Sequence, residues 1–139
     1  MTIAQAMCTS FKAEILDEQH DLIADTIKLA LYTSSATLNA TTTAYATTNE
    51  LANGNGYSTG GVTLGSKAIA TTGTSVGFDF ADPTFTSATF TANGALIYNS
   101  TNGNKAIAVL AFGGDFTVAG GTFTIVLPAA GANAIIRID

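Results

Sequence analysis

The chain has 139 residues, and only 11% of them are charged, which leaves a formal net charge of −5 at pH 7. A chain of this length normally forms one domain, so we expect a single domain over residues 1–139. Nucleic acids and anionic membranes bind clustered Lys and Arg side chains. The five cations of this chain are scattered along it, so we expect neither as a partner.

The polar surface of so weakly charged a chain must come mainly from Thr, Ser, Asn and Gly. Depletion of charged residues is typical of the cores of protein interfaces. It therefore favours a protein that takes part in a lasting assembly. The alternative is a small β-protein that is Thr-rich without any such role.

The cysteine content and the apolar runs bear on the compartment. The single cysteine, Cys8, excludes an internal disulfide and a zinc site built from cysteines. The N-terminal residues lack the basic and apolar regions of a signal peptide, and the longest apolar run, residues 106–112, is far too short to span a bilayer. We therefore expect a protein that is made and stays in a soluble compartment.

The N-terminal residues predict the one helix of the chain, over residues 3–16. Thr2 and Gln5 have the spacing of a capping box. Apolar residues then recur at every fourth position, at Ile3, Met7, Phe11 and Ile15. This apolar stripe must be buried, either against the sheet of the same chain or against a neighbouring subunit.

The next two segments differ in regularity. In residues 26–33 large apolar side chains alternate with other residues, which predicts a half-buried strand. Residues 34–61 are the least regular part, and their two Asn-Gly pairs exclude a continuous strand or helix. A loop this long in a small domain is usually functional or disordered. Because Tyr45, Leu51 and Tyr57 give it apolar anchors, we expect an ordered contact loop.

From residue 62 onward the pattern is one of strands and turns. Asn102-Gly103 lies between the apolar runs 95–98 and 106–112, which is a strong hairpin signal, and the second run is apolar enough for a central strand covered on both faces. A bulge is predicted at Asn93-Gly94, and a second hairpin with its turn at residues 119–121. The other predicted strands are residues 62–70, 76–80, 85–98, 116–118, 122–127 and 134–138. Seven or eight short strands and one N-terminal α-helix predict a mainly β fold, an antiparallel β-sandwich or jelly-roll-like domain.

Residues 56–60 match the G-x-S-x-G motif of serine hydrolases letter for letter. That motif needs a strand before it, a helix after it and a general-base histidine later in the chain. Here a Gly/Asn loop precedes it, and the only histidine, His20, lies upstream. A tight glycine turn that presents Tyr57 is the simpler interpretation.

Two further groups of residues have simple structural interpretations. Cys8 and His20 would suit a thiolate–imidazole pair, but Cys8 lies on the apolar side of the predicted helix, where a cysteine usually behaves as a small buried hydrophobe. The carboxylates and the histidine of residues 17–25 fit neither an EF-hand nor an H-E-x-x-H zinc motif, so we expect a solvated acidic link. We therefore predict no catalytic residue, no metal site and no cofactor, and a protein that is not an enzyme.

Five stretches of the chain resemble a family of small structural proteins of tailed bacteriophages. The stretches follow one another in the same order over nearly the whole chain and read TIAQAMCTSFK, IKLALYTSSATLNATTTAY, TNELANGNGYSTGG, GALIYNSTNGNKAIAVLAF and AIIRID. The resemblance implies a virion protein without enzymatic activity, assembled in the cytoplasm of the host bacterium.

Within such a family, a capsid decoration (cement) protein is the leading hypothesis. It would bind the major capsid protein or other virion proteins, bridge capsid subunits and form a homo-oligomer, with a trimer favoured. The expected contact residues are Met7 and Phe11 of the helix and Leu51 and Tyr57 of the loop, because bulky apolar and aromatic side chains carry hot-spot energy. A tail or head–tail junction component is the alternative within the virion. A carbohydrate-binding or adhesin β-sandwich module is a further alternative, in which tyrosines would take the place of the absent tryptophan.

Overall fold

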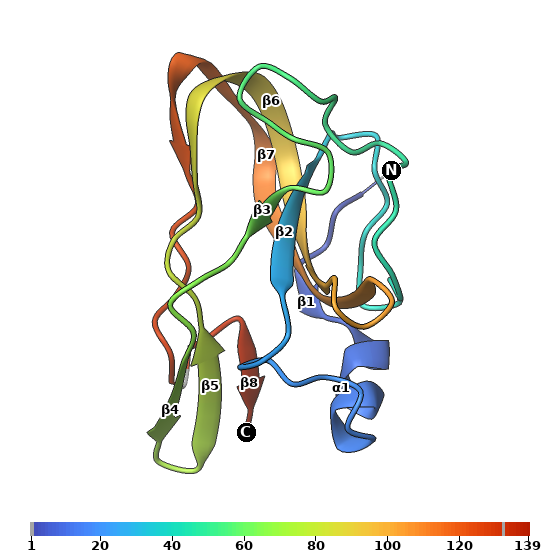
Figure 1. Ribbon diagram of the computed structural model, residues 1–139, viewed down its shortest axis with the longest axis vertical. Coiled ribbons are helices and arrows are strands. Elements are labelled where there is room, and N and C mark those ends of the chain that lie inside the picture. The colour runs from blue at the N-terminus through green and yellow to red at the C-terminus, as the bar shows by residue number, and fades with distance from the viewer. Residues whose placement is uncertain (1, 132) are drawn as a thin grey trace.

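A computed structural model describes residues 2–131 and 133–139 of the chain (Figure 1). It is mainly β, with 47% of the chain in strands and 6% in a helix near the N-terminus. The elements are β1 (Ala6–Met7), α1 (Thr9–Leu16), β2 (Ile27–Tyr32), β3 (Val62–Thr63), β4 (Ala68–Thr72), β5 (Ser75–Asp79), β6 (Thr84–Asn99), β7 (Lys105–Thr124) and β8 (Ile136–Ile138).

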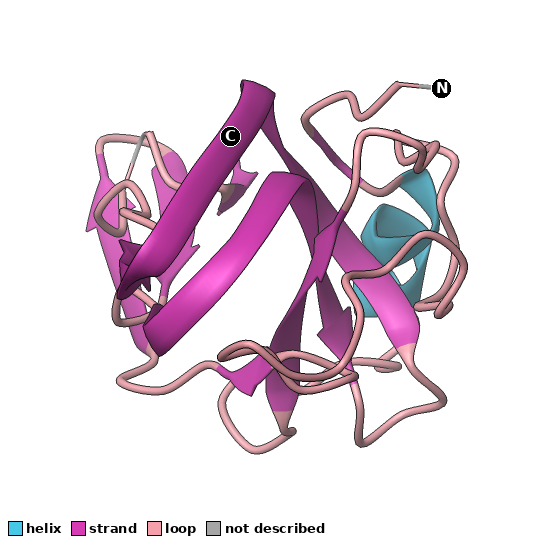
Figure 2. Cartoon of the chain, turned by 90° about the horizontal axis from the view of Figure 1, so that it is seen from above, coloured by secondary structure: helices cyan, strands magenta, loops and turns pink. Residues whose placement is uncertain are grey.

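The strands form two antiparallel sheets. The larger sheet has the order β1-β7-β6-β2-β3 and the smaller one the order β4-β5-β8. Figure 2 shows α1 on one flank of the strands. The predicted mainly β, antiparallel, sandwich-like fold with one N-terminal helix is therefore confirmed.

The long β6–β7 hairpin dominates the fold. Asn99 pairs with Lys105 across the turn that contains Asn102-Gly103, as predicted. Between β1 and β6, the first part of β7 is buried on both faces, with residues 106–110 at most 4% exposed. The predicted central strand is thus confirmed, because neighbouring strands and the core cover it on every side.

The hairpin bends sharply halfway along its length. β6 has a register shift between Ala92 and Gly94, which confirms the predicted bulge, and β7 passes through Gly113 and Gly114 with φ of 79° and 157°. Figure 1 shows that beyond this bend the hairpin folds over beside the main sheet. We call this outer half, residues 84–92 and 116–124, the ribbon.

Two strand predictions are wrong. The predicted second hairpin at Gly120-Gly121 does not exist, because β7 continues as one strand to Thr124 and β6 pairs with it throughout, with an irregularity at these glycines. A Gly-Gly pair suits a bulge as well as a turn. The predicted strand 62–70 is split into β3 and β4 by an interruption at Ser66, whose φ is +51°.

β2 is also more buried than predicted. It lies between β3 and β6, and every residue of β2 except Lys28 is buried. The expected half-buried strand is therefore wrong in its exposure, although its position is confirmed.

The predicted helix over residues 3–16 is too long. α1 begins at Thr9, Cys8 is its N-cap residue, and no side chain caps it, so the predicted capping box at Thr2 does not form. Ala6 and Met7 instead pair with Val109 and Ala108 of β7. The free edge of β7 offers these residues backbone partners, and this tertiary pairing overrides the local helical period.

Candidate interaction surfaces

The loop of residues 34–61 is held in place by the carboxylate of Glu50. Its Oε1 accepts hydrogen bonds from the Tyr57 hydroxyl (2.6 Å) and the Gly60 amide (2.7 Å), and its Oε2 accepts one from the Tyr45 hydroxyl (2.7 Å). Burial, together with this carboxylate, raises the pKa of Tyr57 and of Tyr45 far above the usual range. Both hydroxyls therefore stay protonated and act as donors.

The other two tyrosines complete the same cluster. The Tyr98 hydroxyl donates to the Gly60 carbonyl (2.6 Å), and its ring stacks on Tyr45 at 4.4 Å. Burial, and then the charge of Glu50, raises the pKa of Tyr98 to about 12. The Tyr32 hydroxyl donates to a loop carbonyl. Three of the four tyrosines are thus buried, and Tyr45 is half-buried with one face of its ring stacked on Tyr98, so the tyrosines are poorly placed to stack on a sugar ring.

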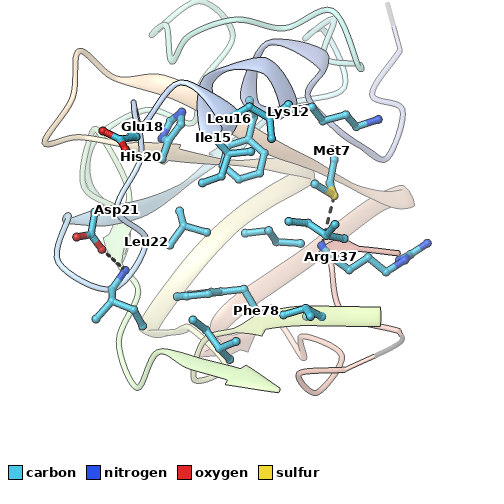
Figure 3. A pocket seen from close by; sticks show the side chains of 17 residues that line it. Met7, Lys12, Ile15, Leu16, Glu18, His20, Asp21, Leu22, Phe78 and Arg137 are labelled. Carbon is cyan, nitrogen blue, oxygen red and sulfur yellow. Dashed lines mark hydrogen bonds between the residues drawn. The ribbon is translucent and has the colours of Figure 1, made fainter. Parts of the chain in front are cut away.

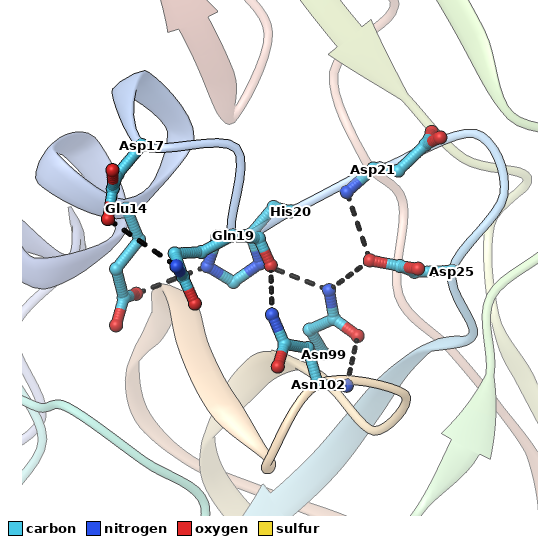
Figure 4. A network of polar contacts seen from close by, with 8 residues as sticks. All are labelled: Glu14, Asp17, Gln19, His20, Asp21, Asp25, Asn99 and Asn102. Carbon is cyan, nitrogen blue, oxygen red and sulfur yellow. Dashed lines mark hydrogen bonds and ion pairs between the residues drawn. The ribbon is translucent and has the colours of Figure 1, made fainter.

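A second polar network joins α1 to the turn of the β6–β7 hairpin (Figure 4). The side-chain oxygen of Asn99 accepts the backbone N–H groups of Thr101 and Asn102, so its amide nitrogen must face His20 and Asp25. The Nδ1 of His20 therefore accepts from Asn99 at 3.1 Å. Its Nε2 then carries the proton and donates to Glu14 at 3.1 Å.

This network fixes the segment that follows α1. The Asn99 amide donates to Asp25 (2.7 Å), and this bond, followed by the backbone N–H of Asp21, holds the pKa of Asp25 below its usual value. The Phe11 ring packs edge-on against His20 at 5.0 Å. The expected solvated link is thus wrong for His20, which is buried.

No group of three or more His, Cys, Asp or Glu residues that could hold a metal ion occurs in the described part of the chain.

Cys8 has no activating surroundings. It is fully buried at the start of α1, and burial, followed by the charge of Glu14, raises the pKa of its thiol to about 11. A protonated thiol is a poor nucleophile. Both ring nitrogens of His20 are engaged with Glu14 and Asn99, so neither is available as a base for Cys8.

An apolar groove of about 780 Å³ lies between the α1 side of the molecule and the small sheet (Figure 3). The apolar side chains of its first wall are Met7, Phe11, Ile15, Leu16, Leu22 and Ile23. The apolar side chains of its second wall are Ile69, Val76, Phe78, Ile136 and Ile138. Five of the seven large apolar side chains that the described residues expose belong to it: Leu16, Ile23, Ile69, Val76 and Ile138.

The charged residues of the groove are separated by sign. Figure 3 places Lys12 and Arg137 beside Met7 at one end, and Glu18 and Asp21 at the other. The apolar side chains lie between these two ends. The groove is therefore apolar in the middle, with Glu18 and Asp21 at one end and Lys12 and Arg137 at the other, where Arg137 forms an ion pair with Asp139 of the same chain (3.5 Å).

The ribbon offers a surface of a different kind. Neither of its strands carries a charged residue. Its outer face bears exposed threonines, namely Thr84, Thr86, Thr89, Thr91, Thr117, Thr122 and Thr124. Cross-strand hydroxyl pairs join Thr91 to Thr117 (2.8 Å) and Thr84 to Thr124 (3.3 Å). Within the described residues no third strand pairs with the ribbon. The loop nevertheless covers part of its β6 edge, where the Thr89 N–H donates to the Asn55 carbonyl and a Cβ on Gly56 would lie only 2.8 Å from the Ser87 carbonyl oxygen, so the open edge is that of β7.

The four predicted contact residues lie in two separate places. Met7 is half-buried at the cationic end of the groove, and Phe11, 2% exposed, lies on its floor. Leu51 and Tyr57 are 6% and 3% exposed in the loop, far along the chain from the groove residues. Three of the four side chains thus contribute to the core of their own domain, since bulky apolar residues in a small domain are needed there first.

The exposed residues of the groove, among them Ile69, Val76 and Ile138, were not predicted. The alternation of apolar and other residues in these short strands was the available signal, but it does not show which face of the sheet stays uncovered.

Comparisons with protein-family models, with curated proteins and with solved structures found no match. No helix among the described residues is long and apolar enough to cross a membrane.

Proposed function

We propose that the protein is a structural component of a tailed-bacteriophage virion, and specifically a capsid decoration protein that binds the major capsid protein and stabilises the shell. The observation that carries the proposal is the ribbon, an uncharged Thr-rich surface whose β7 edge is open. The resemblance of the five sequence stretches to virion proteins supports the same conclusion.

The ribbon suits a broad and static contact. Threonine is β-branched and stiff, so ordering it at an interface costs little side-chain entropy. No charge has to be removed from water when the ribbon is covered. The unpaired N–H and C=O groups along its β7 edge can pair with another backbone, and a free protein normally protects such an edge. Contacts of this kind become lasting when a shell repeats them by symmetry.

Oligomer formation, with a trimer favoured, belongs to the same proposal, because threefold positions recur over a capsid. A tail or head–tail junction component would use the same surfaces in fewer copies. The carbohydrate-binding alternative is less well supported, since the tyrosines that would stack on sugars lie inside the Glu50 cluster.

Copy number tests the proposal. Virions of a phage that encodes this chain are purified, and the chain is quantified by mass spectrometry against the major capsid protein. A ratio near one per capsid subunit is expected for decoration. A ratio of a few per hundred would move the protein to the tail or portal, and absence from the particle would overturn the virion assignment.

A variant tests the ribbon itself. Replacing Thr86 and Thr122 by Lys places two charges on the uncharged face, and we expect binding to shells that lack the protein to fall at least tenfold. Thr71→Lys, on an exposed position of β4, is the matched control and should bind as the wild type does. Equal binding by both variants, with unchanged thermal unfolding, would exclude the ribbon as the contact surface.

A further inference from the structure

The rim of the groove consists of apolar side chains that are mostly exposed. Leu16 is 87% exposed, Ile138 62%, Ile69 59% and Ile23 55%, although all four line the groove. Soluble monomers rarely expose so contiguous an apolar patch. A small ligand would fill the floor and leave these rim side chains in water, whereas a protein surface would cover floor and rim together. The occupant that fits is therefore a protein.

The charges at the two ends suggest which protein. A second copy of the chain, turned by 180° about an axis that crosses the groove, would place its acidic end over the cationic end of the first copy. Lys12 would then face Glu18 of the second copy, whereas Arg137, already paired with Asp139 of its own chain, would lie near Asp21 of the second copy without depending on it. Rotation about an axis along the groove would instead bring Lys12 over Arg137 of the second copy, which is repulsive. The charge pattern is thus self-complementary in one orientation.

The groove is also preformed. The bonds of His20 to Glu14 and Asn99 tie α1 to the β6–β7 turn. The N–H of Arg137 meets the Met7 sulfur at 3.4 Å, which joins β8 to β1 at the cationic end. Both walls are therefore attached to the core of the domain before a partner arrives, and little conformational entropy is lost on binding.

We propose that the groove is a two-fold interface between two copies of this chain, with the apolar walls packed together and opposite charges paired at each end. The proposal does not depend on the capsid assignment, because isolated protein would form the same pair. In a shell, such a contact would link copies that sit on neighbouring threefold positions.

Sedimentation velocity of the purified protein from 1 to 500 μM is the direct test. We expect the wild type to form a species of twice the 14.1 kDa chain mass, or of twice the trimer mass where the trimer of the proposed function also forms. Leu16→Asp should raise the dimer dissociation constant about 100-fold, since the two-fold axis places the charge in the interface twice. Val126→Asp is the control, because Val126 is 78% exposed but does not line the groove, and it should dimerise normally.

A charge exchange tests the orientation. Lys12→Glu and Glu18→Lys should each weaken the dimer about tenfold. An equimolar mixture of the two variants should restore it, because each substituted end then meets its opposite. Failure of the mixture to restore the dimer would overturn the two-fold geometry.

Three other outcomes would overturn the proposal outright. One is a wild type that stays monomeric at 500 μM while palmitate binds it in a calorimetric titration, which would make the occupant a small amphipathic ligand. Another is a monomer whose attachment to shells is lost in Leu16→Asp, which would make the occupant a capsid subunit. The last is a wild-type oligomer whose mass Leu16→Asp does not halve. Copy number in the virion is measured separately, so failure here leaves the decoration proposal standing.

Discussion

The hydroxyl group of Tyr57 joins the loop of residues 34–61 to β2, and the substitution Tyr57→Phe removes it while keeping the ring. That hydroxyl donates to Glu50 at 2.6 Å and accepts the backbone N–H of Leu31 at 3.0 Å. Leu31 is completely buried, so in the variant its N–H has no partner. The ring contacts with Phe85 and Phe90, at 5.9 and 6.3 Å, are kept.

The magnitude follows from these two bonds. An orphaned buried donor costs about 1–3 kcal/mol, and a hydrogen bond to a charged group contributes about 1.5–3 kcal/mol. We expect Tyr57→Phe to lower the free energy of unfolding by about 3 kcal/mol. Tyr45→Phe is the matched control, because it removes one bond to the same carboxylate at a half-buried site and orphans no backbone group. Its expected cost is about 1 kcal/mol.

Urea unfolding followed by circular dichroism measures both variants against the wild type. The expected order is a larger loss for Tyr57→Phe than for Tyr45→Phe, with unchanged m-values. Equal losses would refute the reasoning, because they would show that the Leu31 N–H finds another partner or that the Glu50 cluster does not hold the loop.

Three further predictions concern stability at alkaline pH, the hydrogen bonds of Asn99 and the close packing of the Gly61 backbone against β2. Folding raises the pKa of Cys8 from 9.0 to about 11 and the pKa of Tyr98 from 10.0 to about 12, so the stability that these protonated groups contribute is complete below pH 9 and is lost between about pH 9 and 12. Absorbance at 295 nm should show tyrosinate appearing together with unfolding, and tyrosinate that appears before unfolding would contradict this prediction. Asn99→Ala should lower the free energy of unfolding by about 3 kcal/mol or more, because Asn99 is fully buried and bonds His20, Asp25 and two backbone N–H groups. In this variant the pKa of Asp25, followed by NMR, should rise, and an unchanged pKa would exclude the Asn99 bond as the cause of its lowering. Gly61→Ala should prevent stable folding, since the added Cβ would lie 1.8 Å from the Leu29 carbonyl oxygen. Gly54→Ala is the control, because Gly54 also has a positive φ but lies in open space, and it should lower the free energy of unfolding by about 1 kcal/mol. Similar thermal unfolding of the two variants would disprove the clash at Gly61.

Local signals predicted those parts of the fold in which neighbouring residues decide the conformation. The Asn102-Gly103 turn and the Asn93-Gly94 bulge were predicted because the surrounding apolar runs leave few other conformations. The start of the helix was predicted too early, and a turn was predicted at Gly120-Gly121 where β7 in fact continues. In both cases a strand distant in the sequence supplies the backbone partners. Residues 3–7 follow a helical period and yet are not helical, since Ala6 and Met7 pair with the edge of β7 and Ile3 bridges to Leu38.

The candidate surfaces were harder to predict for the same reason. The walls of the groove come from residues 7–23, 69–78 and 136–138, and only the folded chain brings them together. The sequence identifies Met7 and Phe11 as apolar, but it does not separate a core residue from an exposed one. His20 likewise appeared as part of an acidic run, and its partner Asn99 lies 79 positions away.

The two surfaces differ in charge, and salt should therefore separate the contacts that they make. The groove has opposite charges at its ends, whereas the ribbon has none. Raising the salt concentration from 0.1 to 1 M shortens the Debye length from about 10 to about 3 Å and screens exposed ion pairs. Dimerisation through the groove should weaken several-fold, and Lys12→Glu should then lose most of its effect. Binding of the ribbon to shells should stay unchanged, because it buries hydroxyls and backbone groups without pairing charges. If shell binding instead fell with salt as steeply as dimerisation, the charged groove would be the surface that contacts the capsid, and the ribbon would have no part in attachment.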